Sequence, residues 1–90
     1  MKHLSQTTQF ARDVERMRKR GKSLEKLKKA VTVLAQGGDL DPKHRDHALI
    51  GPWHSCRACH LEPDWVLIYT RDERNLRLER TGTHSDLFKK

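Results

Sequence analysis

The side chains best suited to chemistry in this chain are three histidines, an aspartate and an arginine. His47 lies in a polar stretch, His60 and Asp64 flank a short Pro-containing segment, and Arg80 and His84 lie near the C-terminus. Imidazole titrates near neutral pH, so a histidine can act as acid or base. Arginine is permanently charged and contacts phosphate through two donors. These groups meet the needs of metal-independent RNA cleavage: a base for the 2′-hydroxyl, an acid for the leaving 5′-oxygen and a cation for the phosphate.

Taken singly, each of these residues has an ordinary structural explanation. Most histidines are surface or core residues, and this is our interpretation of His3, His44 and His54. An arginine can equally pair with a surface carboxylate. The grouping favours a site, because Asp64 leaves the turn that follows His60, while the arginine and the last histidine leave the end of a neighbouring strand. An antiparallel meander can bring these positions together at one edge.

Two amphipathic helices are predicted in the first half of the chain. Their apolar residues recur at helical spacing in two stripes: Phe10, Val14 and Met17, then Leu24, Leu27, Val31 and Leu34. Thr7 or Thr8 can cap the first helix, Gly21 breaks it, and Ser23 can cap the second. A glycine pair at 37–38 ends the second helix. We expect two antiparallel helices joined by a short turn.

The second half of the chain changes to strand-like patterns. We predict strands at residues 53–61, 65–70 and 76–81, separated by a tight hairpin turn at 62–64 and a polar turn at 71–75. A polar loop over residues 39–52 precedes these strands, and a short helical turn over residues 83–88 follows them. Residues 2–7 can form a short edge strand, although the pattern there does not decide the question.

The order of these elements predicts an α+β fold in a single domain, residues 1–90. Two N-terminal antiparallel helices would pack on one face of a small twisted, mainly antiparallel β-sheet, with a short C-terminal helical turn. The other face of the sheet, or one of its edges, then stays available for function.

The positive charge of the chain is concentrated in one segment. Within a net charge of +7, residues 12–29 carry nine Lys or Arg side chains against three carboxylates. A solvated helix face would explain this, but a local cationic excess also suits a polyanion, because each phosphate contact releases counterions. We expect contact with nucleic acid or the ribosome through seven side chains: Arg12, Arg16, Lys19, Arg20, Lys22, Lys26 and Lys29.

The lengths of the apolar runs bear on the cellular compartment in which the protein is expected. No apolar run is long enough to span a membrane, and the N-terminus lacks the apolar region of a secretory signal. A cytoplasmic protein is therefore expected. Its two cysteines would then be thiols.

The segment Cys56-x-x-Cys59-His60 matches the pattern of c-type haem attachment. Strand alternation would place the two thiols on opposite faces, which disfavours haem attachment, and a redox dithiol is disfavoured as well. A zinc site would lack a second pair of cysteines at standard spacing. We expect that Cys59 fills an apolar position and that Cys56 lines the open face. We accordingly predict no cofactor and no metal.

Three fragments carry a resemblance to a known family: DHALIGPW at 46–53, HLEPDWVLIY at 60–69 and LERTGTH at 78–84. Together they resemble the RelE/ParE toxin superfamily, in particular its YafQ branch of messenger-RNA-cleaving toxins. The resemblance implies the RelE-like fold, a ribosome-dependent endoribonuclease (an mRNA interferase) that inhibits translation, and an antitoxin protein partner. Seven positions match the residue types of the family's active site: His47, His60, Asp64, Trp65, Arg80, His84 and Phe88.

The resemblance leads to specific roles for these residues. We expect His47 to be the base, His84 the acid, and Arg80 and His60 the groups that hold the scissile phosphate. Asp64 would orient an imidazole or share the role of base. The two aromatic residues, Trp65 and Phe88, would stack on a base or wall the pocket.

The predicted alternation of side chains along the last strand conflicts with the role expected for Arg80. Leu76, Leu78 and Arg80 alternate regularly, so a regular strand would turn Arg80 toward the core. A β-bulge or the end of the strand must re-aim this side chain.

Two other classes of function stay open on the sequence. The ParE branch of the same fold inhibits gyrase by binding it, and an RNA-binding module would not cleave. A pure binding protein has no need of several imidazoles around an arginine, so this histidine set favours the nuclease.

Overall fold

A computed structural model describes residues 1–88. Its five-stranded sheet has the order β1-β5-β4-β3-β2, in which β1 runs parallel to β5 and the other neighbours are antiparallel. The strands are β1 (His3–Gln6), β2 (His47–Ala48), β3 (Arg57–Glu62), β4 (Trp65–Arg71) and β5 (Asn75–Gly82). The helices are α1 (Thr8–Lys19), α2 (Leu24–Ala35) and α3 (His84–Leu87), with 3₁₀ turns η1 (Pro42–His44) and η2 (Gly51–Trp53). The predicted α+β fold is confirmed, and residues 3–6 form the edge strand that the sequence left open.

One predicted strand began too early. The prediction started it at residue 53, whereas β3 starts at Arg57 because residues 51–53 form a 3₁₀ turn. Gly51 has a φ of 69°, which favours glycine, and its carbonyl accepts the N–H of His54. The short strand β2 also lies within the stretch predicted as loop. This pairing of β2 with β3 brings His47 onto the sheet.

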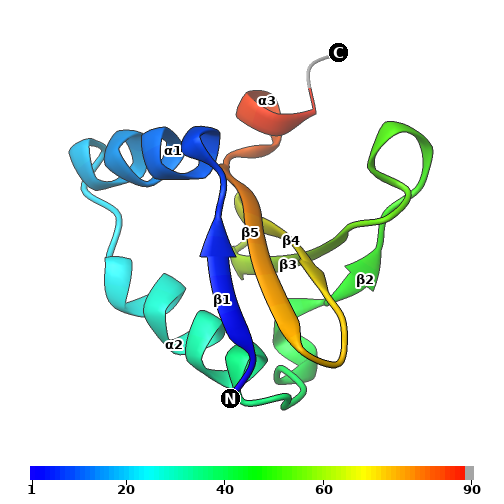
Figure 1. Cartoon of the computed structure of the whole chain (residues 1–90). Helices are drawn as coiled ribbons and strands as arrows, with labels where there is room; N and C mark the ends of the chain where they lie inside the picture. Colours follow the sequence, from blue (N-terminus) through cyan, green and yellow to red (C-terminus); the bar gives the residue numbers. More distant parts are fainter. Residues whose placement is uncertain (89–90) are drawn as a thin grey trace.

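The two long helices lie on the same side of the sheet (Figure 1). Thr7 caps α1 by accepting the N–H of Phe10 at 2.9 Å, as predicted, whereas Ser23 precedes α2 without a side-chain cap. Gly21 has a φ of 84° and ends the first helical segment. The apolar stripes of both helices therefore face one layer of strands.

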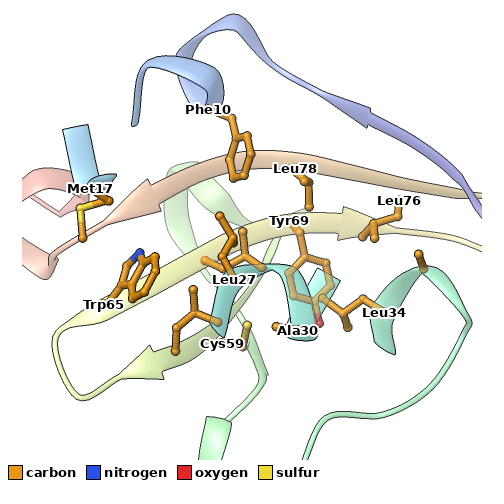
Figure 2. Packing of buried hydrophobic residues seen from close by; sticks show 13 residues of the cluster. Phe10, Met17, Leu27, Ala30, Leu34, Cys59, Trp65, Tyr69, Leu76 and Leu78 are labelled. Atoms are coloured by element: carbon orange, nitrogen blue, oxygen red, sulfur yellow. The ribbon is translucent and has the colours of Figure 1, made fainter. Parts of the chain in front are cut away.

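The main core fills the space between the helices and the sheet. Figure 2 shows Met17 of α1 beside Trp65 of β4, with Leu27 of α2 and Cys59 of β3 nearby. Trp65 is fully buried, with none of its surface accessible. Burial of apolar area on this scale is the principal source of stability for a chain of this size.

The opposite face of the sheet carries a second, smaller cluster. Cys56, Ala58, Val66, Ile68 and Leu87 are buried there, and partly buried apolar side chains surround them. Cys56 was expected to line the open part of this face. That expectation was wrong for the thiol, because Leu87 of α3 and apolar side chains of the loop before β3 cover the part of the face where Cys56 lies.

A β-bulge in β5 redirects Arg80. Tyr69 pairs with Leu78 and Ile68 pairs with Arg80, so Glu79 is an extra residue on β5. A regular strand would have put Arg80 on the face of Leu78, in the main core. The bulge instead turns it to the face of Ile68. The expectation that a bulge re-aims this arginine is confirmed.

Candidate active site

The strand register aligns His47 and Arg80 on the second face of the sheet. His47 of β2 pairs with Ala58 of β3, which pairs with Ile68 of β4. Arg80 of β5 completes this row opposite Ile68. Residues directly opposite each other in a sheet project from the same face. An imidazole and a guanidinium therefore project from the same face at the two ends of a row whose middle members, Ala58 and Ile68, are buried.

The neighbouring row brings in the other two histidines. His60 of β3 is opposite Val66 of β4, which is opposite Gly82, the last residue of β5. His84 begins α3 two residues later. The ring centroids of His47 and His60 are 6.2 Å apart, and those of His60 and His84 are 5.4 Å apart. Three imidazoles from three separate elements thus form a line across this face.

Asp64 fixes the orientation of His84. A carboxylate oxygen of Asp64 lies 2.6 Å from Nδ1 of His84 and also accepts the backbone N–H of His84 at 3.0 Å. These two hydrogen bonds hold the pKa of Asp64 below its usual value. Nδ1 of the imidazole is directed at this carboxylate, so Nε2 is the ring nitrogen left to act on a substrate.

His47 is oriented by the backbone of its own loop. Its Nδ1 lies 2.7 Å from the carbonyl oxygen of Arg45, which makes Nδ1 the donor and leaves Nε2 as the acceptor in the neutral ring. The preceding Asp46 anchors the loop to the sheet. Its carboxylate accepts hydrogen bonds from the hydroxyl of Tyr69 and from Nε of Arg57. This geometry suits a base whose free nitrogen faces the substrate.

His60 lies between the other two imidazoles and is the least solvated of the three. Its buried Nδ1 has no hydrogen-bond partner within residues 1–88. Burial lowers the pKa of His60 below 6.5, and the charges of Arg45, His84 and His47 lower it further. His60 is therefore mainly neutral at pH 7. A neutral ring contacts phosphate by hydrogen bonding and not by charge, and the expected role of His60 in holding the phosphate stays a prediction.

The lowered pKa of His60 predicts a pH-dependent stability. Below pH 6.5 the unfolded chain binds a proton at this site that the folded chain resists, so stability falls as the pH is lowered from 6.5 through the folded pKa. The replacement His60→Gln should flatten this part of the curve of Tm against pH, and the matched exposed replacement His3→Gln should leave it intact. Thermal melts between pH 7 and pH 5 measure both. An unchanged slope in His60→Gln would contradict the assignment.

Arg80 is held by a carboxylate on α1. Its Nε and Nη2 donate to Asp13 at 2.7 and 3.2 Å, and this side-chain hydrogen bond is the main cause of a raised pKa for Arg80. The side chain of Asp13 is fully buried and also accepts the backbone N–H of Thr81. The guanidinium of Arg80 is therefore fixed in position and permanently charged.

The two aromatic residues that were expected to contact substrate differ in their positions. Trp65 is fully buried in the main core, and its Nε1 donates to Oγ1 of Thr81 at 2.9 Å. The expectation that Trp65 stacks on a base or walls the pocket was wrong, since the strand places its indole under the helices. Phe88 is partly exposed, and its ring centroid lies 6.1 Å from that of His84. A wall role for Phe88 stays a prediction.

Sequence reasoning missed two residues that bear on the site, Arg45 and Asp13. Arg45 lies near enough to His60 to lower its pKa, and it adopts a left-handed backbone with a φ of 47°. Its position two residues before His47 was the available signal. Nothing local marked Asp13, because its partner is 67 residues away in the chain.

Four of the seven cations assigned to RNA contact form ion pairs within the chain: Arg16, Arg20, Lys22 and Lys26. Their partners are Asp86, which ties α3 to α1, Glu62 at the end of β3 and, for Arg16, also Asp13. The other three form no ion pair within residues 1–88: Arg12, Lys19 and Lys29. They lie exposed on α1 and α2 and are the cations most free to meet a polyanion.

The two thiols do not form a joint site. Cys59 belongs to the main core and Cys56 to the second cluster, on the other face of the sheet. Burial raises the pKa of Cys59 to about 12, so it stays a thiol. The expected placement of the cysteines on opposite faces is confirmed.

A family model described as a bacterial toxin of type II toxin-antitoxin systems, YafQ, matches residues 2–89. The chain belongs to the YafQ family. It is 44% identical over 81 residues to the mRNA interferase toxin YafQ of Escherichia coli K12, which covers 89% of this chain and 88% of that protein. The crystal structure of YafQ from Escherichia coli BL21(DE3) superposes with a TM-score of 0.93 at 39% identity, over 98% of this chain and 99% of that chain.

A second solved structure of the YafQ family contains a partner. The toxin in the Escherichia coli DinJ-YafQ complex has a TM-score of 0.91 and 40% identity, over 98% of this chain and 99% of that chain. These similarities extend over the whole sheet and its helices, and so over every element that carries the three imidazoles. Within residues 1–88, none of the helices is long and apolar enough to cross a membrane.

Proposed function

We propose that this YafQ-family toxin is an endoribonuclease that cleaves messenger RNA and so inhibits translation. The observation that carries the proposal is the line of three imidazoles, His47, His60 and His84, on the sheet face to which the bulge turns Arg80. The name of the Escherichia coli relative, an mRNA interferase, supports the same substrate. The acid, the base and the phosphate-binding groups in the proposal are all side chains of this chain.

The proposed reaction uses the 2′-hydroxyl of the RNA as its nucleophile. Nε2 of His47 removes the proton from this hydroxyl, and the 2′-oxygen forms a bond to the adjacent phosphorus. The bond from phosphorus to the 5′-oxygen breaks, and Nε2 of His84 supplies the proton that this oxygen takes up. The products are a 2′,3′-cyclic phosphate and a 5′-hydroxyl end. Two imidazoles in opposite protonation states are required, and each returns to its starting state after proton exchange with water.

The phosphate needs stabilisation while negative charge builds on its non-bridging oxygens. Arg80 supplies a permanent charge that is already oriented before substrate binds, so little reorganisation is needed during the reaction. Neutral His60 lies between acid and base and donates or accepts a hydrogen bond without adding a third positive charge to the cluster. Asp64 keeps the ring of His84 in the productive orientation.

We propose that the ribosome presents the message and that exposed cations on α1 and α2 contact its RNA. The charge-reversal triple variant Arg12→Glu, Lys19→Glu, Lys29→Glu should weaken ribosome binding by 10-fold or more at low salt and flatten the salt dependence, since each phosphate contact contributes to the salt slope. A co-sedimentation titration at several salt concentrations measures this. The matched control reverses the ion-paired Arg18, whose charge Glu15 already satisfies. Equal binding by the triple variant and the parent would contradict the proposal.

We further propose that a cognate antitoxin protein binds this toxin in the cytoplasm. The solved DinJ-YafQ complex of a similar toxin supports a protein partner of this kind. A partner with acidic surface would associate rapidly with the cationic helices.

Primer extension on a translated message tests the proposed activity. We expect discrete cuts when ribosomes are present and few or none on the same naked RNA. A separate analysis of the 3′ end of the upstream fragment should find a 2′,3′-cyclic phosphate. Uncut messages together with inhibited supercoiling by gyrase would instead favour the ParE-like class of inhibitor. Tight RNA binding without cuts would favour an RNA-binding module.

A further inference from the structure

The buried carboxylate of Asp13 has no part in the reaction steps above, yet it contacts Arg80 directly. Asp13 lies on the core-facing side of α1, and the accessible fraction of its side chain is zero. A buried charge is costly unless it is paired and its lone pairs are satisfied. Asp13 meets both conditions, with Arg80 as its closest cation.

The partners of Asp13 define one geometry for Arg80. Oδ2 accepts from Nε of Arg80 at 2.7 Å and from the backbone N–H of Thr81 at 3.2 Å, and Oδ1 accepts from Nη2 of Arg80 at 3.2 Å. Gln9 donates to Oδ1 at 3.2 Å, and Arg16 lies 3.5 Å from the same oxygen. A two-point contact to a planar guanidinium fixes both its position and its plane.

The contact also leaves one side of the guanidinium free. Nε and Nη2 face Asp13, so Nη1 and the second proton of Nη2 are the donors left for a ligand. Asp86 is the other carboxylate whose charge acts on Arg80, and it is itself paired with Arg20. The side chain of Arg80 keeps 23% of its surface accessible, so these donors can meet an anion from solvent.

A hydrogen-bonded chain continues from Asp13 into the core. Thr81, whose N–H is bound by Asp13, accepts Nε1 of Trp65 through its hydroxyl oxygen and donates that hydroxyl to the carbonyl of Val66. The chain fixes the bulged end of β5 against β4 and α1 together. Through Thr81, the buried Trp65 therefore helps to support Arg80, which Asp13 holds.

We propose that Asp13 is the positioning residue for Arg80 in the cleavage reaction, and that Thr81 and Trp65 support it. The inference rests on the proposed role of Arg80 as the phosphate-binding cation. Asp13 does not touch the substrate. It acts by holding the guanidinium where its free donors meet the phosphate, and a misplacement of about 1 Å in such a group reduces rates by roughly 10²-fold.

A double-mutant cycle separates positioning from a merely structural role. Asp13→Asn should lower the single-turnover cleavage rate roughly 10²-fold, and Arg80→Ala should lower it at least as much. In the Arg80→Ala background, Asp13→Asn should cause no further loss of rate, because the group it positions is gone. The double variant should also be more stable than Arg80→Ala, since Asp13→Asn removes a buried charge that has lost its closest cation. The matched control Glu15→Gln removes a carboxylate from the surface of the same helix.

The outcomes distinguish this inference from the proposed function. Normal cleavage by a folded Arg80→Ala variant would overturn the role of Arg80 itself. Loss in Arg80→Ala with an independent, multiplicative loss in Asp13→Asn would overturn only the positioning role. A measurement on the unaltered protein covers the case in which Asp13→Asn fails to fold. The Nε–H of Arg80 should exchange with solvent far more slowly in NMR spectra than that of the exposed Arg12, and equal exchange rates would contradict the proposal.

Discussion

Cleavage should fall by roughly 10²- to 10⁴-fold in His84→Ala, the range that a general acid or base contributes to a rate. The structural reason is that the Nε2 of His84 is the only proton donor in the proposed reaction for the leaving 5′-oxygen. Quantitative primer extension on a translated message measures the rate. The matched control is His3→Ala, which removes an exposed histidine from β1. Residual cleavage within a few-fold of the parent would contradict the assignment of His84 as the acid.

Replacing Asp64, the carboxylate beside His84, should lower the cleavage rate by a smaller factor. Asp64 is exposed and lies 2.6 Å from Nδ1, so Asp64→Asn should leave the ring in place through the retained backbone contact but alter its hydrogen bonding. The expected loss of rate is smaller than in His84→Ala. A loss in Asp64→Asn that exceeds the loss in His84→Ala would favour Asp64 as a direct proton acceptor.

Arg80→Ala should have the second large effect, roughly 10²- to 10³-fold in the cleavage rate, the range seen when a preorganised transition-state donor is removed. The variant also removes the closest cation from the buried carboxylate of Asp13, which keeps Arg16 at 3.5 Å, so the free energy of unfolding should fall by at most about 3–5 kcal/mol. Rates must therefore be measured well below the Tm of the variant, with circular dichroism to confirm folding.

Two further variants calibrate the Arg80 result. Arg80→Lys keeps a charge but loses the planar two-point contact, so it should restore part of the stability and little of the rate. Arg77→Ala removes an exposed arginine from the same strand and should change neither quantity appreciably. Equal loss of rate in Arg77→Ala and Arg80→Ala would show that strand charge alone, and not the position of Arg80, sustains cleavage.

Much of the fold was readable from the sequence because local signals agreed with one another. The apolar stripe from Phe10 to Met17 and the glycine at 21 predicted α1 and its end, and the hairpin at 62–64 predicted the turn between β3 and β4. Even the bulge was inferable, since Leu76, Leu78 and Arg80 could not all face the core. These features depend on residues close in the chain.

The parts that sequence reasoning missed depend on contacts between distant residues. The parallel pairing of β1 with β5 joins residues more than 70 positions apart, and a four-residue strand carries little periodicity. Trp65 reads equally well as a surface aromatic or a core residue until the helices are placed over β4. The neighbourhood of His60, Asp64 and His84 was expected from their positions near strand ends and from the family resemblance, whereas the support that Asp13 gives to Arg80 was not.

The most direct test of acid catalysis by His84 uses an RNA in which sulfur replaces the bridging 5′-oxygen at the cut site. A thiolate leaves without protonation, so loss of the acid should matter little for this substrate. His84→Ala should then cleave the sulfur-containing RNA at close to the rate of the parent protein while remaining slow on ordinary RNA. An equally large defect on both substrates would contradict the central claim that His84 protonates the leaving group.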